Sequence, residues 1–216
     1  MSAESEVVTK AHFDYIAART AHDDAFLVDL KRASRAAGIP AIQISPEQAS
    51  LMQILLRLCG AREVVEVGTL AGYSAIWMAR ALPQGGRVRT IEYLAKHADF
   101  AESWVAKSDV AGKVEVHRGA GADVMRTFAA NSADAAFLDA DKASYPLYLR
   151  ESLRIVRKGG LVMVDNAFAF GQLFHERPTD REANAVKAFN EVMAATHELQ
   201  SVIVPMGDGL WVGVKL

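Results

Sequence analysis

The chain has 216 residues, of which 51% are apolar and 23% are charged. This length and composition exclude disordered, collagen-like and disulfide-framework proteins. The 24 Lys and Arg residues nearly balance the 26 Asp and Glu residues, and the net charge is -2. No polybasic run supports non-specific binding to nucleic acid. The single cysteine, Cys59, excludes an internal disulfide bond and a cysteine-based zinc site.

The first residues, Met-Ser-Ala-Glu-Ser-Glu, are polar and acidic, unlike a secretory signal peptide. No apolar stretch approaches the ~20 residues that a membrane-spanning helix requires. We therefore expect a soluble, cytoplasmic protein without a membrane partner. We also expect one domain over 1–216, with a helical segment at 1–60 and a cofactor-binding α/β core at 61–216.

The first 60 residues carry helical patterns. Apolar residues between Phe26 and Ala33 recur at helical spacing, and Gly38-Ile39-Pro40 interrupts that pattern. Ser45-Pro46-Glu47-Gln48 then predicts the start of a second helix, because Ser is a good cap and Pro suits the first helical position. This helix is expected to run to Gly60.

After Gly60, short apolar runs alternate with amphipathic segments. The alternation is typical of βαβ units and predicts a parallel sheet with helices on both faces. The predicted strands are Glu63–Val67, Arg87–Glu92, Val114–Arg118, Ala135–Asp139 and Gly160–Asp165, and the predicted helices lie near 72–82, 94–109, 121–130 and 144–157.

The last part of the chain departs from this alternation. A helix is predicted near 180–197, followed by strands at Ser201–Pro205 and Leu210–Val214. The tight turn Gly207-Asp208-Gly209 between these strands predicts an antiparallel hairpin. The sheet is therefore expected to have seven strands and to be mostly parallel. The segment Ala167–Asp180 is long for a loop and is a candidate substrate loop.

Ligands of open parallel sheets bind beyond the carboxyl ends of the strands. The first strand ends in a turn with Gly68 and Gly72, and the second ends in Glu92, which can accept hydrogen bonds from ribose hydroxyls. Together they indicate a nucleoside site, although such a glycine turn also occurs where a helix packs on a sheet. The dinucleotide fingerprint G-x-G-x-x-G is absent, which disfavours a pyrophosphate cofactor. Glu66 is costly to bury unless a cationic group pairs with it.

Polar side chains also follow the fourth and fifth strands. Asp139 ends the fourth strand, and Asp165 and Asn166 end the fifth. If these strands are neighbours, their ends lie about 5 Å apart and offer three oxygen ligands. Such ligands suit magnesium, with calcium or manganese as alternatives. The same residue types also end strands simply as turn formers, but two such ends together with Lys142 favour the metal site.

Taken together, these motifs make the sequence resemble the cation-dependent O-methyltransferases that include catechol and caffeoyl-CoA O-methyltransferases, and above all their small bacterial members. The resemblance runs from about Ile44 to the end of the chain. It implies a Rossmann-like methyltransferase fold, S-adenosylmethionine as cofactor and a divalent cation. Its carriers are Ser45-Pro46-Glu47-Gln48, Glu66-Val67-Gly68-Thr69, Gly72-Tyr73-Ser74, Glu92, Asp139-Ala140-Asp141-Lys142, Asp165-Asn166 and Gly207-Asp208-Gly209.

The resemblance also implies roles for individual residues. The cofactor-binding positions that it assigns are Ile44, Glu66, Gly68, Thr69, Ser74, Glu92, Ala120, Asp139 and Asp141. Asp139, Asp165 and Asn166 match the metal ligands. Lys142 matches the catalytic lysine, which takes the proton of an acceptor hydroxyl whose pKa a divalent ion lowers. Relatives are commonly homodimers, and a homodimer is expected here.

The acceptor is expected to be a vicinal dihydroxy aromatic molecule. Leu70 and Ala71 depart from an aromatic residue and a threonine in many relatives, and these departures concern the acceptor side. Phe168, Phe170 and Phe174 form either an apolar wall for the acceptor or simple loop packing. Three alternatives stay open: a hydroxyuridine base of tRNA as acceptor, a nicotinamide-dependent oxidoreductase, and a cofactor-binding protein without catalytic activity.

Overall fold

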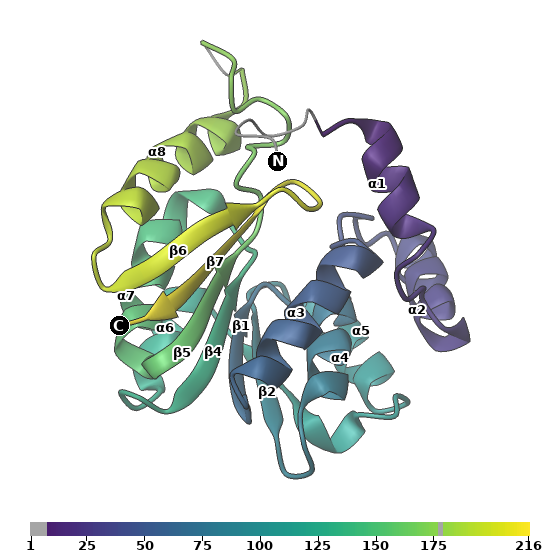
Figure 1. Ribbon diagram of the computed structural model, residues 1–216. Coiled ribbons are helices and arrows are strands. Elements are labelled where there is room, and N and C mark those ends of the chain that lie inside the picture. Colours follow the sequence, from purple (N-terminus) through teal and green to yellow (C-terminus); the bar gives the residue numbers. More distant parts are fainter. Residues whose placement is uncertain (1–7, 177–178) are drawn as a thin grey trace.

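The computed structural model describes residues 8–176 and 179–216, and its centre is a twisted sheet (Figure 1). The strands are β1 (Glu63–Val67), β2 (Arg87–Glu92), β3 (Val114–Arg118), β4 (Ala133–Leu138), β5 (Val156–Val164), β6 (Leu199–Val204) and β7 (Leu210–Lys215). Their order in the sheet is β3-β2-β1-β4-β5-β7-β6. The first five pair in parallel, and β7 runs antiparallel to both β5 and β6. This arrangement confirms the predicted seven-stranded, mostly parallel sheet with a C-terminal hairpin.

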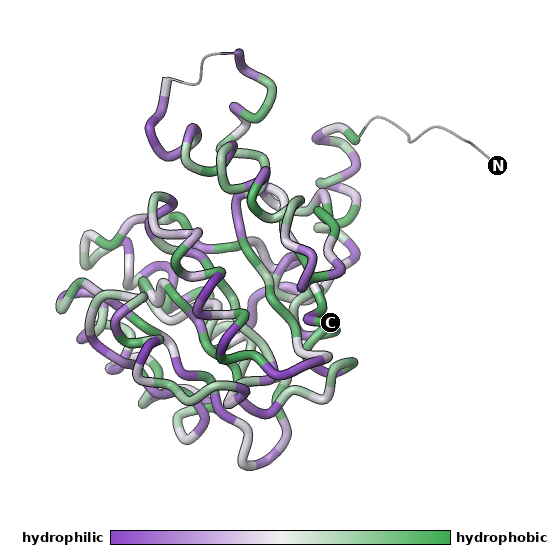
Figure 2. Tube along the Cα trace, turned by 90° about the vertical axis from the view of Figure 1, so that its left-hand side faces the viewer, coloured by the Kyte–Doolittle hydropathy of each residue, from purple (hydrophilic) through white to green (hydrophobic). Residues whose placement is uncertain are grey.

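Helices cover both faces of this sheet (Figure 1). They are α1 (Lys10–Ala17), α2 (Ala25–Ala36), α3 (Pro46–Leu58), α4 (Tyr73–Ala81), α5 (Ala95–Val105), α6 (Gly121–Thr127), α7 (Tyr145–Ile155) and α8 (Arg181–Ala195), with short 3-10 turns η1 (Ala111–Lys113) and η2 (Lys142–Ser144). Hydrophilic and hydrophobic residues alternate along these helices in Figure 2, as expected for helices with one buried side. Among the residues that the structure describes, no helix is both long and apolar enough to cross a bilayer.

The start of α3 follows the sequence expectation. The Ser45 side chain accepts a hydrogen bond from the Gln48 N–H at 3.3 Å, and Pro46 occupies the first turn. The predicted helical segment 1–60 thus contains three helices in its described part, and residues 1–7 lie outside the described residues.

Several predicted boundaries are wrong by a few residues. β4 covers Ala133–Leu138, so Asp139 follows the strand instead of ending it, and β5 begins at Val156 instead of Gly160. Val156 pairs with Ala133, and the register shifts between Ala133 and Ala135. The sequence Lys158-Gly159 resembles a turn, and Gly159 does have a positive φ of 74°. This segment forms an irregularity within β5, because the pairing with β4 passes from Val156 directly to Leu161. The helices predicted at 94–109, 121–130 and 180–197 end two to four residues earlier.

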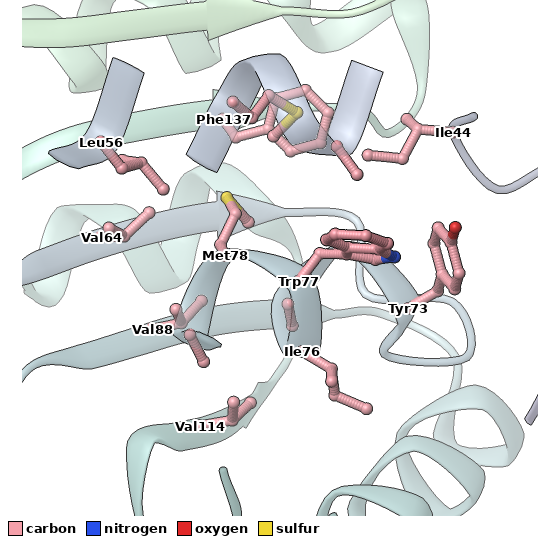
Figure 3. Packing of buried hydrophobic residues seen from close by; sticks show 14 of the residues in the cluster. Ile44, Leu56, Val64, Tyr73, Ile76, Trp77, Met78, Val88, Val114 and Phe137 are labelled. Atoms are coloured by element: carbon pink, nitrogen blue, oxygen red, sulfur yellow. The ribbon is translucent and has the colours of Figure 1, made fainter. Parts of the chain in front are cut away.

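Alternate residues of each central strand contribute to two separate cores. On one face, Val64, Phe137 and Met163 pack with α3 and α4; on the other, Val65, Leu138 and similar residues pack with α6, α7 and α8. Figure 3 shows the first core, where Met78, Ile76 and Trp77 of α4 lie against the strands. Burial on both faces explains why these strands are continuous apolar runs in the sequence.

Ile76→Val is expected to lower the free energy of unfolding by about 0.5–1.5 kcal/mol, because it removes one methylene from a packed site. Ile76 has no exposed surface. Urea denaturation measures the effect. The same change at Ile54 in α3, which is 53% exposed, is the matched control and should leave stability nearly unchanged. Equal losses at the two positions would contradict this account of the core.

Candidate active site

A cavity of about 1020 Å³ opens at the carboxyl ends of β1, β2 and β4. The strand order reverses between β1 and β4, and such a switch point is where open α/β sheets bind ligands. Ten of the twelve predicted site residues line the cavity: Ile44, Gly68, Thr69, Ser74, Glu92, Ala120, Asp139, Asp141, Lys142 and Asn166. Glu66 and Asp165 lie behind its wall, with 0% and 7% of their surface exposed.

The turn after β1 requires glycine at Gly68. This residue has a φ of 102°, and a Cβ atom there would lie 1.9 Å from the backbone carbonyl oxygen of Asp139. A side chain is therefore excluded by geometry as well as by backbone conformation. This contact joins the turn after β1 to the turn after β4. The two turns therefore form one continuous wall of the cavity.

Glu66 is a buried carboxylate with one unsatisfied oxygen. Its Oε1 accepts a hydrogen bond from the Ser74 hydroxyl. Its Oε2 is buried and has no hydrogen-bond partner among the described residues. Burial raises the pKa of Glu66 to about 8, and the carboxylates of Asp139 and Glu92 add to this effect. A cationic ligand group would satisfy Oε2 and stabilise the ionised form.

The raised pKa of Glu66 predicts how stability depends on pH. Between its ordinary pKa of about 4.3 and a pKa of about 8, the native state keeps a proton that the unfolded state has lost. The free energy of unfolding therefore falls as pH rises through this window. Glu66→Gln cannot ionise and should flatten the slope. The test follows thermal unfolding of the ligand-free protein from pH 5 to 8, with exposed Glu191→Gln as control. Identical slopes for the two variants would contradict the prediction.

Glu92 is held in place at the end of β2. It is 8% exposed, and its two oxygens accept hydrogen bonds of 2.9 Å from the backbone N–H groups of Leu70 and Leu94. A carboxylate oxygen has more than one lone pair, so Glu92 can still accept bonds from ligand hydroxyls. Leu70 reaches its contact from the left-handed region, with a φ of 50°.

The other predicted cofactor residues differ in which of their polar groups are already hydrogen-bonded within the protein. The hydroxyl of Thr69 pairs with that of Thr90 at 2.6 Å. The Asp141 carboxylate accepts a hydrogen bond of 2.5 Å from the Tyr148 hydroxyl. Ala120 and Ile44 present only backbone and apolar surface to the cavity.

Parallel pairing of β4 and β5 brings the acidic strand ends together. Leu138 pairs with Val164, and the N–H of Asp165 donates to the Leu138 carbonyl at 3.0 Å. Burial raises the pKa of Asp165 to about 7, and the nearby Asp139 carboxylate adds to the shift. Gln48 donates a hydrogen bond of 2.7 Å to Asp165 Oδ1.

The ligand set at these strand ends contains two carboxylates and one amide. Across residues 8–176 and 179–216, no group of three His, Cys, Asp or Glu side chains could hold a metal ion, so the two carboxylates are joined by an amide oxygen, that of Asn166, in the candidate ligand set. The Asn166 amide lines the same cavity as Asp139. The two carboxylates repel each other, and a bound divalent cation would offset this repulsion. Oxygen atoms are the preferred ligands of such a hard cation. The residues present thus fit such an ion.

Lys142 is buried and held between two partners. It is 6% exposed, which excludes the alternative of a solvated surface lysine. Its Nζ donates to Asp139 Oδ1 at 2.9 Å and to the Tyr145 hydroxyl at 2.7 Å. Burial raises the pKa of Tyr145 well above its ordinary value, so the phenol keeps its proton. The amine therefore lies at the cavity wall in a fixed position.

The three phenylalanines after β5 do not form one wall. Phe170 lines the cavity, and its ring centroid lies 5.9 Å from Lys142 Nζ. Phe174 is 91% exposed, and Phe168 packs against Gly209 of the hairpin turn. Of the two alternatives left open by the sequence, a wall of the cavity therefore fits Phe170, and it does not fit Phe168 or Phe174.

Sequence reasoning missed the contacts of Gln48 and Tyr145 in this site. Gln48 is interpreted from the sequence as a capping residue of α3, and its long-range bond to Asp165 has no sequence signal. Tyr145 follows Lys142 by three residues, a spacing that brings side chains together on a helical turn. That spacing is the available signal for Tyr145.

Comparison with known proteins fits this geometry. A family model described as "O-methyltransferase" matches residues 17–216. The chain belongs to this family. The match confirms the predicted enzyme class, that of the O-methyltransferases.

Curated relatives and solved structures agree with the family. This O-methyltransferase is 36% identical over 204 residues to a catechol O-methyltransferase of Niastella koreensis, with 93% of this chain and 90% of the relative covered. It is 35% identical over 195 residues to a catechol O-methyltransferase of Mycobacterium tuberculosis, covering 90% and 88%. The O-methyltransferase of Bacillus cereus, solved in complex with SAH, superposes with a TM-score of 0.86 at 31% identity, covering 95% of this chain and 97% of that one.

Proposed function

We propose that this O-methyltransferase transfers a methyl group from S-adenosylmethionine to one hydroxyl of a catechol-like aromatic acceptor, and that the reaction depends on a divalent cation. The observation that carries the proposal is the continuous wall of the cavity. The contact between Gly68 and the Asp139 carbonyl brings two groups of residues next to each other. Asp139 and Lys142 follow β4, whereas Glu66, Gly68 and Glu92 lie at the ends of β1 and β2.

The donor side fits S-adenosylmethionine. The unsatisfied Oε2 of Glu66 suits a cationic amino group, and Glu92 suits the ribose hydroxyls. The Bacillus cereus relative, 31% identical, holds SAH, the product that an S-adenosylmethionine-dependent enzyme leaves. We assign Ile44, Thr69, Ser74, Ala120 and Asp141 to the same donor site because they line it.

On the cation side, we assign Asp139, Asp165 and Asn166 as ligands of a divalent ion, with magnesium the expected metal. When bound, such an ion lowers the pKa of an acceptor hydroxyl. Adjacent hydroxyls of a catechol offer two oxygens to one ion, which is why a vicinal diol is the proposed acceptor. The curated relatives named catechol O-methyltransferase support this choice.

Lys142 is the proposed general base. Its buried Nζ is placed by Asp139 and Tyr145. The acceptor O–H bond breaks, and its proton goes to the lone pair of Nζ, which acts as a base in its neutral amine form. The acceptor oxygen then forms a bond to the methyl carbon while the carbon–sulfur bond of the donor breaks, which leaves a neutral thioether. Charge is neutralised in this step, so a site that excludes water favours it.

An assay with labelled S-adenosylmethionine and Mg²⁺ tests the proposal. Catechol and a set of substituted catechols are compared with phenol, and unmodified and hydroxyuridine-containing tRNA are further arms. Methylation of catechols alone is the expected result. Equal rates with phenol would contradict the vicinal diol, and methylation of tRNA alone would replace the acceptor class. An increase of the unfolding temperature with NAD but not with S-adenosylmethionine would contradict S-adenosylmethionine as the donor.

The assembly also belongs to the proposal. We expect a homodimer in which the helices of the first 45 residues form part of the contact surface. Sedimentation equilibrium tests this expectation, and a monomer at micromolar concentration would contradict it.

A further inference from the structure

The hairpin turn between β6 and β7 lies against the chain that leaves β5. The N–H of Ala167 donates to the Gly209 carbonyl at 2.9 Å, and the N–H of Phe168 donates to the Asp208 carbonyl at 2.8 Å. In Figure 1 this turn, in yellow, reaches across the top of the sheet. A turn that is distant in sequence thus supports the segment that begins with Asn166.

The Asp208 carboxylate makes two further hydrogen bonds to the same segment. Its Oδ2 accepts from Asn166 Nδ2 at 3.2 Å and from the backbone N–H of Phe170 at 2.9 Å. An ionised carboxylate only accepts hydrogen bonds. The Asn166 amide can therefore turn only its NH₂ group toward Asp208, and its Oδ1 has no hydrogen-bond partner among the described residues. Asn166 is one of the residues that line the cavity.

The backbone of this segment is strained. Asn166, Ala169 and Phe170 have φ values of 64°, 54° and 57°, in the left-handed region that Asn tolerates but that residues such as Ala and Phe avoid. Such conformations persist only where surrounding contacts hold them. Asp208 supplies a contact at both ends of the strained stretch, through Asn166 and Phe170.

We propose that Asp208 is a positioning residue: it orients the Asn166 amide so that Oδ1 faces the cation site, and it holds Phe170 beside Lys142. The proposal rests on the proposed function, because it takes Asn166 as a cation ligand. Asp208 is not among the residues that line the cavity, and its carboxylate Oδ2 is directed at the amide and the backbone of the segment. The effect on the ion passes through Asn166.

The first test measures the affinity for Mn²⁺ without donor or acceptor, from the electron paramagnetic resonance signal of the free ion. Removal of a group that orients a metal ligand typically weakens metal binding about 10- to 100-fold, and this loss is expected for Asp208→Ala. Asp208→Asn keeps an oxygen that can accept both bonds and should bind Mn²⁺ almost as the unchanged protein does. Asp99→Ala, which removes an exposed carboxylate paired with Arg118, is the control for net charge.

A double-mutant cycle separates orientation from general damage. Asn166→Ala removes the ligand, so adding Asp208→Ala to it should cause no further loss of Mn²⁺ affinity. Circular dichroism and thermal unfolding of each variant report whether the fold survives. A further loss in the double variant would show that Asp208 acts elsewhere and would overturn the proposal.

Other outcomes are also decisive. Mn²⁺ affinity of Asp208→Ala equal to that of the unchanged protein would overturn the positioning role and leave the proposed function intact. Asp208→Asn as weak as Asp208→Ala would mean that charge matters instead of orientation, which also overturns it. Absence of Mn²⁺ binding by the unchanged protein would be a failure of the proposed cation site itself, and the positioning role would fall with it.

Discussion

Lys142→Met is expected to lower kcat by about 10²- to 10⁴-fold, the usual contribution of a general base. Methionine fills a similar volume but cannot take a proton. Lys142 donates hydrogen bonds to Asp139 and Tyr145 and makes no contact with Glu66 or Glu92, so the affinity for S-adenosylmethionine should change little. Steady-state kinetics with a catechol and a separate donor titration measure the two quantities.

A matched control distinguishes catalysis from loss of a positive charge. Lys158 lies in β5 and is exposed, and Lys158→Met should retain full activity. Thermal unfolding of both variants checks that the fold is intact. A Lys142→Met enzyme with undiminished kcat would remove this lysine from the proposed mechanism.

Removing divalent cations is expected to abolish methyl transfer. A bound ion supplies several kcal/mol of charge stabilisation in the transition state, so a loss of about 10³-fold or more in kcat/KM is expected. Dialysis against a chelator followed by the catechol assay measures it, and Mg²⁺ added back should restore activity. Donor affinity should survive the treatment, because Glu66 and Glu92 do not belong to the proposed ligand set.

Asp165→Asn tests the same proposed cation site by changing one of its ligands instead of removing the cation. It removes one of the two proposed anionic ligands, and activity should fall to a level that excess Mg²⁺ restores only in part. Asp109→Asn changes an exposed carboxylate that pairs with Arg80 and serves as control. Full activity of the chelated enzyme, or of Asp165→Asn, would argue for a reaction that needs no cation.

The strands and the strand-end residues could be predicted because they depend on local pattern. Apolar runs buried on both faces mark β1 and β4, and the residue after each such run must lie at the edge of the sheet. The apolar runs place Asp139 and Asp165 at the carboxyl ends of strands, and the two residues are predicted to lie close together if those strands are neighbours. The parallel pairing of Leu138 with Val164 agrees with that prediction.

The remaining contacts could not be predicted, since they depend on how distant segments pack. The bond from Gln48 to Asp165 joins residues 117 positions apart, and no periodicity reports it. The start of β5 is also hidden in the sequence, because Gly159 resembles a turn residue but lies within β5, between the paired residues Val156 and Leu161. Phe168, Phe170 and Phe174 are the same residue type, so the sequence does not show which ring lines the cavity. In the structure Phe170 lines it, Phe168 packs against Gly209, and Phe174 is exposed.

The contact between Gly68 and the Asp139 carbonyl has a consequence for how acceptor choice can evolve or be engineered. The turn after β1 and the turn after β4 touch at this point, so a change in one turn would displace the other. The ends of these strands therefore have little freedom to change. The cavity lining also includes Ile42, in the segment before α3, which is 71% exposed and does not belong to this contact. Libraries that aim at new acceptors should therefore diversify that position and leave the strand ends untouched.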